Sequence, residues 1–371
     1  MEKMTTQRYL ALDVLRGMTI ALMITVNNPG SWSHIYAPLS HSSWHGCTPT
    51  DLVFPFFLFV VGVSMFFSFA KYGNTLNRQS LLRLVKRTLL IFAVGLFLNS
   101  FPQWSKDFSH LRIMGVLQRI ALAYGFASLI VLSVQKKYLP SIGIAILLIY
   151  WGILYFFGTG DPYSLKTNAT IPFDMMVLGK NHLYQGFGIP FDPEGLLSTI
   201  PAVVTAMTGY LAGSIILQSG PGKVPLKLVL GGLGYILCGL LWGQFLPINK
   251  PLWTSSYVLY SAGWASLVLG VLIWAIDMKG YKQWTSFFVV FGRNPLFIFA
   301  LSGLWAITLV RIIRFSGPGG KTVNAYSWIY QHVFVPVAGE LNGSLLFALA
   351  NVLLFWLIGY ILYRNKIIIK V

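Results

Sequence analysis

His41 to Val63 reads HSSWHGCTPTDLVFPFFLFVVGV, a polar, aromatic loop that passes without a spacer into an apolar helix. The loop carries His41, Trp44 and His45, and the apolar run after Asp51 is long enough to enter a bilayer. A histidine at the mouth of a membrane helix can carry a proton or an acyl group. The competing interpretation is an interfacial histidine satisfied by water, and this stretch alone leaves both open.

The composition identifies an integral membrane protein. Of the 371 residues, 56% are hydrophobic and only 10% are charged, whereas soluble domains carry about 25% charged residues. The net charge of +17 does not predict nucleic-acid binding, because the basic residues lie in short links between apolar runs, where they set topology. Cys47 and Cys238 stand far apart, so they predict neither a disulfide framework nor a zinc site.

Ten apolar runs are long enough to cross about 30 Å of hydrocarbon, so we expect an all-α polytopic membrane protein with about ten transmembrane helices. We find neither an internal repeat nor a soluble domain, which predicts a single transmembrane domain over residues 1–371. The expected helices cover residues 9–28, 51–70, 82–99, 113–134, 138–157, 196–217, 227–247, 254–275, 285–310 and 344–364.

The distribution of Lys and Arg predicts the orientation. The two terminal segments and the links on their side hold twice as many Lys and Arg as the links on the other side. Both termini are therefore predicted to be cytosolic, with His41 facing the exoplasmic space. Three long links fall on that exoplasmic side, where we expect a site to be built. They cover residues 29–50, 158–195 and 311–343.

Ionisable groups inside membrane spans cost about 2.5–3.5 kcal/mol each on insertion scales, so each needs a partner. Asp13 and Arg16 lie three residues apart near the cytosolic end of the first helix and can pair with each other. Arg119 lies about two turns inside the fourth helix, where Asp51 is its expected partner. Asn27 follows Asp13 by about four helical turns, so it is expected to face inward near the histidine loop.

The loop before Asp51 also contains residue types that bind metals, since His41, His45 and Cys47 lie close together. Their spacing matches no usual zinc pattern, and aromatic residues interrupt it, so no metal is predicted. The aromatic residues of the exoplasmic links, Trp44 among them, suit stacking on a sugar ring and an interfacial aromatic belt equally well.

Seven motifs occur in order from the first to the ninth expected helix. They are ALDVLRG (11–17), VNN (26–28), HSSWHGCTPTDLVFPFFLFVVG (41–62), RIMGVLQRIAL (112–122), FDPEGLLST (191–199), LWTSSYV (252–258) and FGRNPL (291–296). Together they resemble the transmembrane acetyltransferases typified by heparan-α-glucosaminide N-acetyltransferase. The histidine run together with D-P-E-G is the specific part, whereas DVLRG alone resembles segments of other membrane acyltransferases.

The resemblance implies transfer of an acetyl group from cytosolic acetyl-CoA, as co-substrate, to the amine of a glucosamine-type sugar on the exoplasmic side. His41 falls on the family's catalytic histidine, which acts as acetyl carrier or as general base. Asn27 and Asp51 fall on positions of the same site, and Asp13 and Arg16 match the start of the first helix. The implied partners are an amino-sugar substrate, coenzyme A and the lipid bilayer, and a homodimer stays open.

Two departures from the family pattern bear on where the protein works. We expect no counterpart of the lumenal N-terminal domain of the lysosomal enzyme, and Arg293 and Pro295 flank Asn294 where other residues are expected. We therefore expect a relative in a bacterial inner membrane, with His41 toward the periplasm. Arg293 can snorkel to the cytosolic surface, which leaves Asn294 free to face the bundle.

The co-substrate and the sugar need different side chains. Phosphates of coenzyme A require cations near the cytosolic mouth, and a sugar amine and hydroxyls suit carboxylates and aromatic rings. The expected cofactor-binding residues are Arg16, Arg83, Lys86, Arg87 and Asn294, and the expected substrate-binding residues are Trp44, Asp192, Glu194 and Arg119. Because the pantetheine arm is shorter than the roughly 30 Å core, the histidine loop is expected to dip into the bundle.

Two other functions stay open on the sequence alone. Buried Asp, Arg, Asn and His residues also suit a sugar or acyl-group transporter that performs no chemistry, although the internal repeat of many transporters is missing. An O-acyltransferase of an envelope polysaccharide would differ only in its acceptor. Within the histidine loop, the resemblance selects His41, and His45 is expected to tolerate substitution.

Overall fold

The computed structural model describes residues 9–70, 72–102, 108–316 and 322–369. Nine helices in this part of the chain are long and apolar enough to cross a membrane, which confirms the all-α polytopic fold. A tenth, α3, has the length, but its first half carries Arg83, Lys86 and Arg87. Six cations of the orientation pattern lie outside the described residues: Lys3, Arg8, Lys71, Lys106, Lys321 and Lys370.

The element order follows the expected apolar runs closely up to the ninth. The helices are α1 (Leu10–Asn27), α2 (Pro49–Ala70), α3 (Arg78–Ser100), α4 (Val116–Ser133), α5 (Leu139–Phe157), α6 (Thr170–Leu178), α7 (Thr199–Gln218), α8 (Val224–Trp242), α9 (Ser255–Leu272), α10 (Thr285–Arg293), α11 (Pro295–Ile307), α12 (Ala325–Ile329) and α13 (Val335–Arg364). A short antiparallel hairpin, β1 (Arg314–Ser316) and β2 (Thr322–Asn324), precedes α12.

Glycines let α2 and α7 approach each other closely. A Cβ atom on Gly62 would lie 1.9 Å from the carbonyl oxygen of Ala206, and one on Gly209 would lie 2.0 Å from that of Phe59. In a membrane, where apolar side chains gain nothing by leaving lipid, such close backbone packing is a main source of helix association. The α2–α7 pair therefore forms the centre of the bundle, as its buried side chains indicate.

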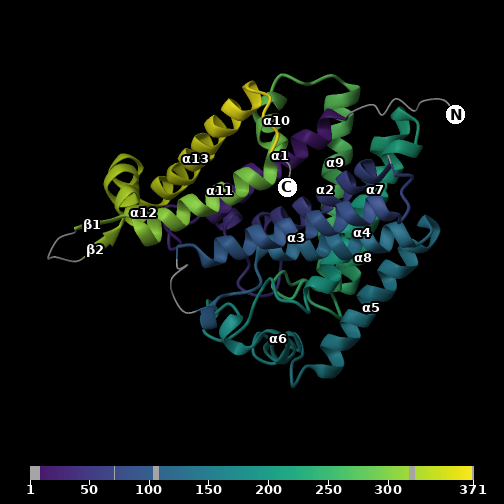
Figure 1. Cartoon of the computed structure of the whole chain (residues 1–371), viewed down its shortest axis with the longest axis horizontal. Coiled ribbons are helices and arrows are strands. Elements are labelled where there is room, and N and C mark those ends of the chain that lie inside the picture. The colour runs from purple at the N-terminus through teal and green to yellow at the C-terminus, as the bar shows by residue number, and fades with distance from the viewer. Residues whose placement is uncertain (1–8, 71, 103–107, 317–321, 370–371) are drawn as a thin grey trace.

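The ninth expected helix, 285–310, is broken in two. Asn294 (φ −130°, ψ 53°) separates α10 from α11, and Pro295 begins the second piece. Proline cannot donate to the preceding turn and disfavours the α conformation in the residue before it, so the break is encoded locally. Figure 1 shows the result, since α11 leaves the direction of α10 and runs obliquely beside α13 toward the hairpin.

The two ends of the described chain lie on one side of the bundle. Arg16 Nη1 of α1 donates to the carbonyl oxygen of Gly292 in α10 at 3.4 Å. Asn294, two residues after Gly292, donates its side-chain amide to the carbonyl oxygen of Ile367 at 3.0 Å. The start of α1 and the segment after α13 therefore meet around the same break.

The long links predicted to be exoplasmic contain more structure than their sequence indicates. The link at 158–195 holds α6, and the link at 311–343 holds the hairpin, α12 and the first turns of α13. The last helix therefore begins before the expected residue 344, and a bend at Gly339 (φ 75°) marks where its apolar run begins. The apolar pattern predicted only the part of this helix beyond the bend.

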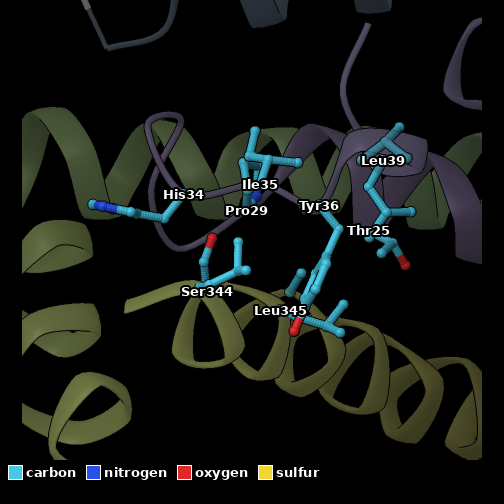
Figure 2. A pocket seen from close by; sticks show the side chains of 11 residues that line it. Thr25, Pro29, His34, Ile35, Tyr36, Leu39, Ser344 and Leu345 are labelled. Carbon is cyan, nitrogen blue, oxygen red and sulfur yellow. The ribbon is translucent and has the colours of Figure 1, made fainter. Parts of the chain in front are cut away.

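The loop between α1 and α2 rests on α13. Gly30 N donates to Ser344 O at 3.1 Å, and Ser31 N donates to Ser344 Oγ at 3.1 Å. Figure 2 shows Ser344 below Pro29, and Tyr36 directed at Leu345, whereas His34 points away. Only ≈ 10 Å³ of space remains between the loop and the helix. The last helix thus fixes the loop that presents His41.

Candidate active site

His41 and Asp51, ten residues apart, meet where the loop turns into α2. His41 Nδ1 lies 2.7 Å from Asp51 Oδ1. The His41 side chain is 42% exposed, whereas that of Asp51 is 1% exposed. Because the Asp51 carboxylate can only accept, the neutral imidazole carries its proton on Nδ1. The other ring nitrogen, Nε2, then has a free lone pair. In the described residues nothing bonds to that nitrogen.

Donors of the loop before α2 hold the Asp51 carboxylate in its ionised form. Oδ2 accepts from Ser42 N at 3.1 Å, from Thr48 N at 3.0 Å and from Thr48 Oγ1 at 3.0 Å. Several donors on one carboxylate favour the ionised state. Because Asp51 stands in the first turn of α2, the positive end of the helix dipole favours its negative charge further.

Pro55 explains a second contact at Asp51. Its ring nitrogen has no proton, so the backbone carbonyl of Asp51, four residues earlier, loses its usual helical donor. The hydroxyl of Tyr257, on α9, supplies a replacement and donates to this carbonyl oxygen at 2.6 Å. A buried tyrosine from a distant helix therefore anchors the start of α2.

Lys250 completes the cluster from the link between α8 and α9. Its Nζ lies 3.4 Å from Asp51 Oδ1 and 3.1 Å from His41 Nδ1, and its side chain is 19% exposed. Burial lowers the pKa of the Lys250 ammonium below its ordinary value, and the nearby carboxylates of Asp51 and Glu194 act in the opposite direction. The cation offsets part of the Asp51 charge that the imidazole meets.

Trp44 and His45 tie the histidine loop to two neighbouring loops. Trp44 Nε1 donates to the carbonyl oxygen of Tyr163 at 2.8 Å, and its ring packs edge-on against Phe191. The side-chain amide of Asn249 donates to the Trp44 carbonyl oxygen at 2.9 Å and lies 3.3 Å from His45 Nδ1. Burial lowers the pKa of the His45 imidazole. Trp44 is half-buried, so one part of its ring stays available to a ligand.

Asp192 and Glu194 lie in the loop before α7, and both bind Arg112. The guanidinium meets Asp192 through two nitrogens, at 2.9 and 2.7 Å, and Glu194 at 2.6 Å. It also lies over the Tyr184 ring, 4.7 Å from its centroid. The two carboxylates raise the pKa of Arg112 against the effect of its burial. The negative charge expected to attract a sugar amine is therefore partly matched by a cation of the chain.

Arg119 does not meet its expected partner. It is fully buried and bonds Gly195 O at 3.3 Å and Ser198 Oγ, with its guanidinium 4.9 Å from the centroid of the Trp253 ring. Asp51 is already surrounded by the donors of its own loop and by Lys250, so it is not available to Arg119. Arg119 thus supports the loop before α7 from inside the bundle.

Asn27 is exposed rather than directed inward. It is the last residue of α1, and the next residue, Asn28, is the buried amide that bonds back to Ile24 O at 2.8 Å. At a helix end the regular 3.6-residue period stops, so extrapolation of the inward face from Asp13 fails there. The Asn27 side chain lines a cleft beside α11 and α12 instead.

A cleft of ≈ 740 Å³ opens on the side of the chain termini. Four of the five residues expected to bind coenzyme A line it together: Arg16, Arg83, Lys86 and Arg87. Arg293 contributes a further cation. Arg16 is fixed in the wall, since its guanidinium bonds Asp13 at 3.2 Å and Ser64 Oγ at 2.6 Å. The cleft therefore combines a positive rim with an apolar interior, where Phe57 and Leu296 lie.

Asn294, the fifth expected residue, holds the chain's own C-terminal segment. Its amide donates to Ile367 O at 3.0 Å, and its side-chain oxygen accepts from Ile369 N at 2.8 Å. The side chain is buried, and Ile369 lines the cleft in its place. Asn294 therefore shapes the cleft through the segment that it positions.

One helix connects the cleft with the histidine cluster. The residues of α2 that line the cleft extend from Ser68 to Phe57, and Asp51 lies six residues beyond Phe57. At 1.5 Å per residue the uncovered stretch is about 9 Å along the helix axis. Buried aromatic side chains, Phe54 among them, fill this stretch.

Comparison with known proteins gives this arrangement a family. The sequence model described as "Heparan-alpha-glucosaminide N-acetyltransferase, catalytic" matches residues 8–223, more than half of the chain. The chain belongs to this family. The matched region covers α1 to α7, including the histidine loop, Asp51 and the basic part of α3.

Two curated members of the heparan-alpha-glucosaminide N-acetyltransferase family match over a longer stretch. The enzyme of that name from Mus musculus is 29% identical over 352 residues, which cover 80% of this chain and 53% of the mouse protein. The Homo sapiens enzyme is 27% identical, with 79% and 52% covered. The chain spans about half the length of these relatives.

Sequence analysis did not assign several residues that the structure places at the site. Lys250, Asn249 and Tyr257 come from α9 and the link before it, and Arg112 precedes α4. Arg112 and Tyr257 lie in two of the motifs that carry the resemblance, which was the signal available for them. Lys250 and Asn249 look like ordinary interfacial polar residues.

Proposed function

We propose that this protein moves an acetyl group from acetyl-CoA on the cytosolic side to the amine of a glucosamine-type sugar on the opposite side. The supporting observation is that α2 connects two features. It begins at the His41–Asp51 pair, and its other end lines the basic cleft. The family membership supports the same reaction class. A bacterial inner membrane, with His41 toward the periplasm, is the proposed setting.

His41 is the proposed base or acyl carrier. In direct transfer, the sugar nitrogen bonds to the thioester carbonyl carbon, His41 Nε2 takes the amine proton, and the C–S bond breaks. The leaving thiolate of coenzyme A then takes a proton from the imidazolium. In the two-step route, Nε2 first bonds to that carbon while the C–S bond breaks and the thiolate leaves. The amine nitrogen then bonds to the same carbon while the Nε2–C bond breaks, and the amine proton passes through the freed imidazole to the thiolate. Asp51 orients the ring and stabilises its positive form in both routes.

The basic cleft is the proposed site of coenzyme A. Arg83, Lys86 and Arg87 carry the charges that phosphates need, and the apolar interior suits the pantetheine arm. The remaining stretch of about 9 Å along α2 is shorter than an extended arm. The buried aromatic residues there, including Phe54, must move aside to let the thioester reach His41. Together with the expected dip of the loop into the bundle, this opening brings the thioester to His41.

The sugar side is proposed at the rim around His41. The half-buried ring of Trp44 offers a stacking surface, and Glu194 is the more accessible of the two carboxylates on Arg112. Side-chain exposure is 15% for Glu194 and 0% for Asp192. Glu194 is therefore the better candidate to receive the amine, and Asp192 holds the loop.

The test uses proteoliposomes with acetyl-CoA on one face and glucosamine on the other. We expect wild-type protein to form N-acetylglucosamine and release free coenzyme A thiol in equal amounts. We expect His41→Ala to lower the rate by at least about 100-fold, because general acid–base catalysis contributes about 10²–10⁴-fold. The matched control is His45→Ala, which removes an exposed imidazole of the same loop and should keep most of the rate.

Normal acetylation by His41→Ala would show that the assignment is wrong. Transport of glucosamine without thiol release would favour the transporter instead. Acetylation of a sugar hydroxyl with the amine left free would favour O-acylation.

A further inference from the structure

A second cleft, of ≈ 430 Å³, lies on the same side of the bundle as the histidine loop. It is formed where the end of α1 and the residues after it meet the end of α11 and the segment of α12. His41, Asp51 and Lys250 are not among its lining residues. It is therefore a separate site, although Trp32 in its wall and His41 belong to one loop.

Two tyrosines that line this cleft are fixed in position. Tyr326 donates its hydroxyl to the Pro29 carbonyl oxygen at 2.7 Å, and Tyr330 donates to that of Glu340 at 2.9 Å. The Tyr330 ring packs against Gly30 so closely that a Cβ there would lie 2.4 Å from it. Because both hydroxyls are tied to backbone, the rings form a rigid wall that needs no ordering when a ligand binds.

Three side chains of the cleft have polar groups that are free for a ligand. Within the described part of the chain, no hydrogen bond occupies the side-chain amides of Asn27 and Gln331 or the indole nitrogen of Trp32. All three residues are exposed, and Trp32 is 65% exposed, which is high for so large an apolar ring. Amides that both donate and accept, beside an open aromatic face, suit a ring with hydroxyls on its rim and C–H groups on its face.

Charge narrows the ligand class further. None of the described residues lining this cleft is an Asp, Glu, Lys, Arg or His. A phosphate headgroup or a sulfated sugar would need cations there, and a free amine would need a carboxylate. A purely acyl ligand would leave the amides of Asn27 and Gln331 without partners. A neutral sugar satisfies both the aromatic and the amide groups.

We propose that this cleft binds a neutral pyranose unit of a glycan, stacked on Trp32 and hydrogen-bonded by Asn27 and Gln331. The binding itself does not depend on the proposed acetyl transfer. If both hold, the acceptor is an oligosaccharide, gripped by the same loop that presents His41.

The test measures binding of the N-acetylglucosamine tetramer to the full chain in phosphatidylcholine nanodiscs, by saturation-transfer NMR and calorimetry. We expect Trp32→Ala and Gln331→Ala each to weaken binding by about ten-fold, the loss of one good stacking or hydrogen-bonding contact. Trp284→Ala is the matched control, because Trp284 is an exposed tryptophan at the start of α10, on the other side of the bundle. It should bind as wild type does.

Two results would overturn the proposal, provided that the variants unfold at the wild-type temperature. One is a tetramer affinity that Trp32→Ala and Gln331→Ala leave unchanged, or that falls only in His41→Ala. The other is a tryptophan fluorescence change on adding lysophosphatidylcholine that Trp32→Ala abolishes, with no such change on adding the tetramer, which would mark a lipid site.

Discussion

Asp51 has two charged or chargeable neighbours at one oxygen, His41 Nδ1 at 2.7 Å and Lys250 Nζ at 3.4 Å. A carboxylate stabilises an imidazolium, and a cation beside both opposes that stabilisation. Lys250 therefore offsets part of the negative charge that Asp51 presents to the His41 imidazole. Sequence reasoning paired Asp51 with Arg119, and the loop donors around the carboxylate explain why that pair does not form.

Removal of Lys250 should shift the pH dependence of the reaction. Burial lowers the pKa of the Lys250 ammonium, so wild-type protein loses this cation as the pH rises through a value below that of an ordinary lysine. We expect the rate of wild-type protein to change over this range, and this limb of the pH profile to be absent in Lys250→Met, which has no charge to lose. The measurement is kcat against pH in proteoliposomes. Lys250→Arg keeps its charge to higher pH and should also lack the limb; a limb that stays in Lys250→Met would show that the lysine has only a packing role.

At the scale of elements, two local sequence signals position the site. Pro55 removes a helical donor, and Tyr257 replaces it at the Asp51 carbonyl. Pro295 breaks the ninth expected helix and sends α11 toward α13, on which the histidine loop rests. Close glycine contacts between α2 and α7 then hold the helix that links the cleft with His41.

Gly62→Ala should separate α2 from α7. The added Cβ would lie 1.9 Å from Ala206 O, a contact with backbone that no side-chain rotation relieves. We expect a loss of about 2 kcal/mol in the free energy of unfolding, the usual cost of overpacking. Unfolding in mild detergent, followed by circular dichroism, measures it. Gly234→Ala on α8 is the control, since a Cβ there meets nothing within 4 Å; equal losses in both variants would contradict the close-packing argument.

At the scale of the whole molecule, charge is divided between the two ends of the bundle. The cleft near the termini gathers Arg16, Arg83, Lys86, Arg87 and Arg293 in its wall. On the histidine side, Arg112 and Lys250 are matched by carboxylates. An anionic co-substrate is thereby favoured at the first end and not at the second.

Neutralising the cleft should weaken acetyl-CoA use without changing the chemistry. In Arg83→Ala/Arg87→Ala we expect KM for acetyl-CoA to rise by about ten-fold with kcat nearly unchanged, because both guanidiniums face the cleft and neither lies near His41. Arg78→Ala removes an exposed cation of the same helix outside the cleft and is the control. A KM that rises as much in the control would point to overall charge rather than to this cleft.

The sequence by itself determined the membrane class and nearly all helix positions, because hydropathy is a local property. The resemblance to the family placed His41 and Asp51 at one site, and four of the five residues expected to bind coenzyme A line one cleft. The tertiary structure alone decided which distant groups join them: Lys250 and Tyr257, some 200 residues beyond Asp51, and α13 beneath the histidine loop. No periodicity records which loops meet, since that depends on how close the backbones of separate helices can pack.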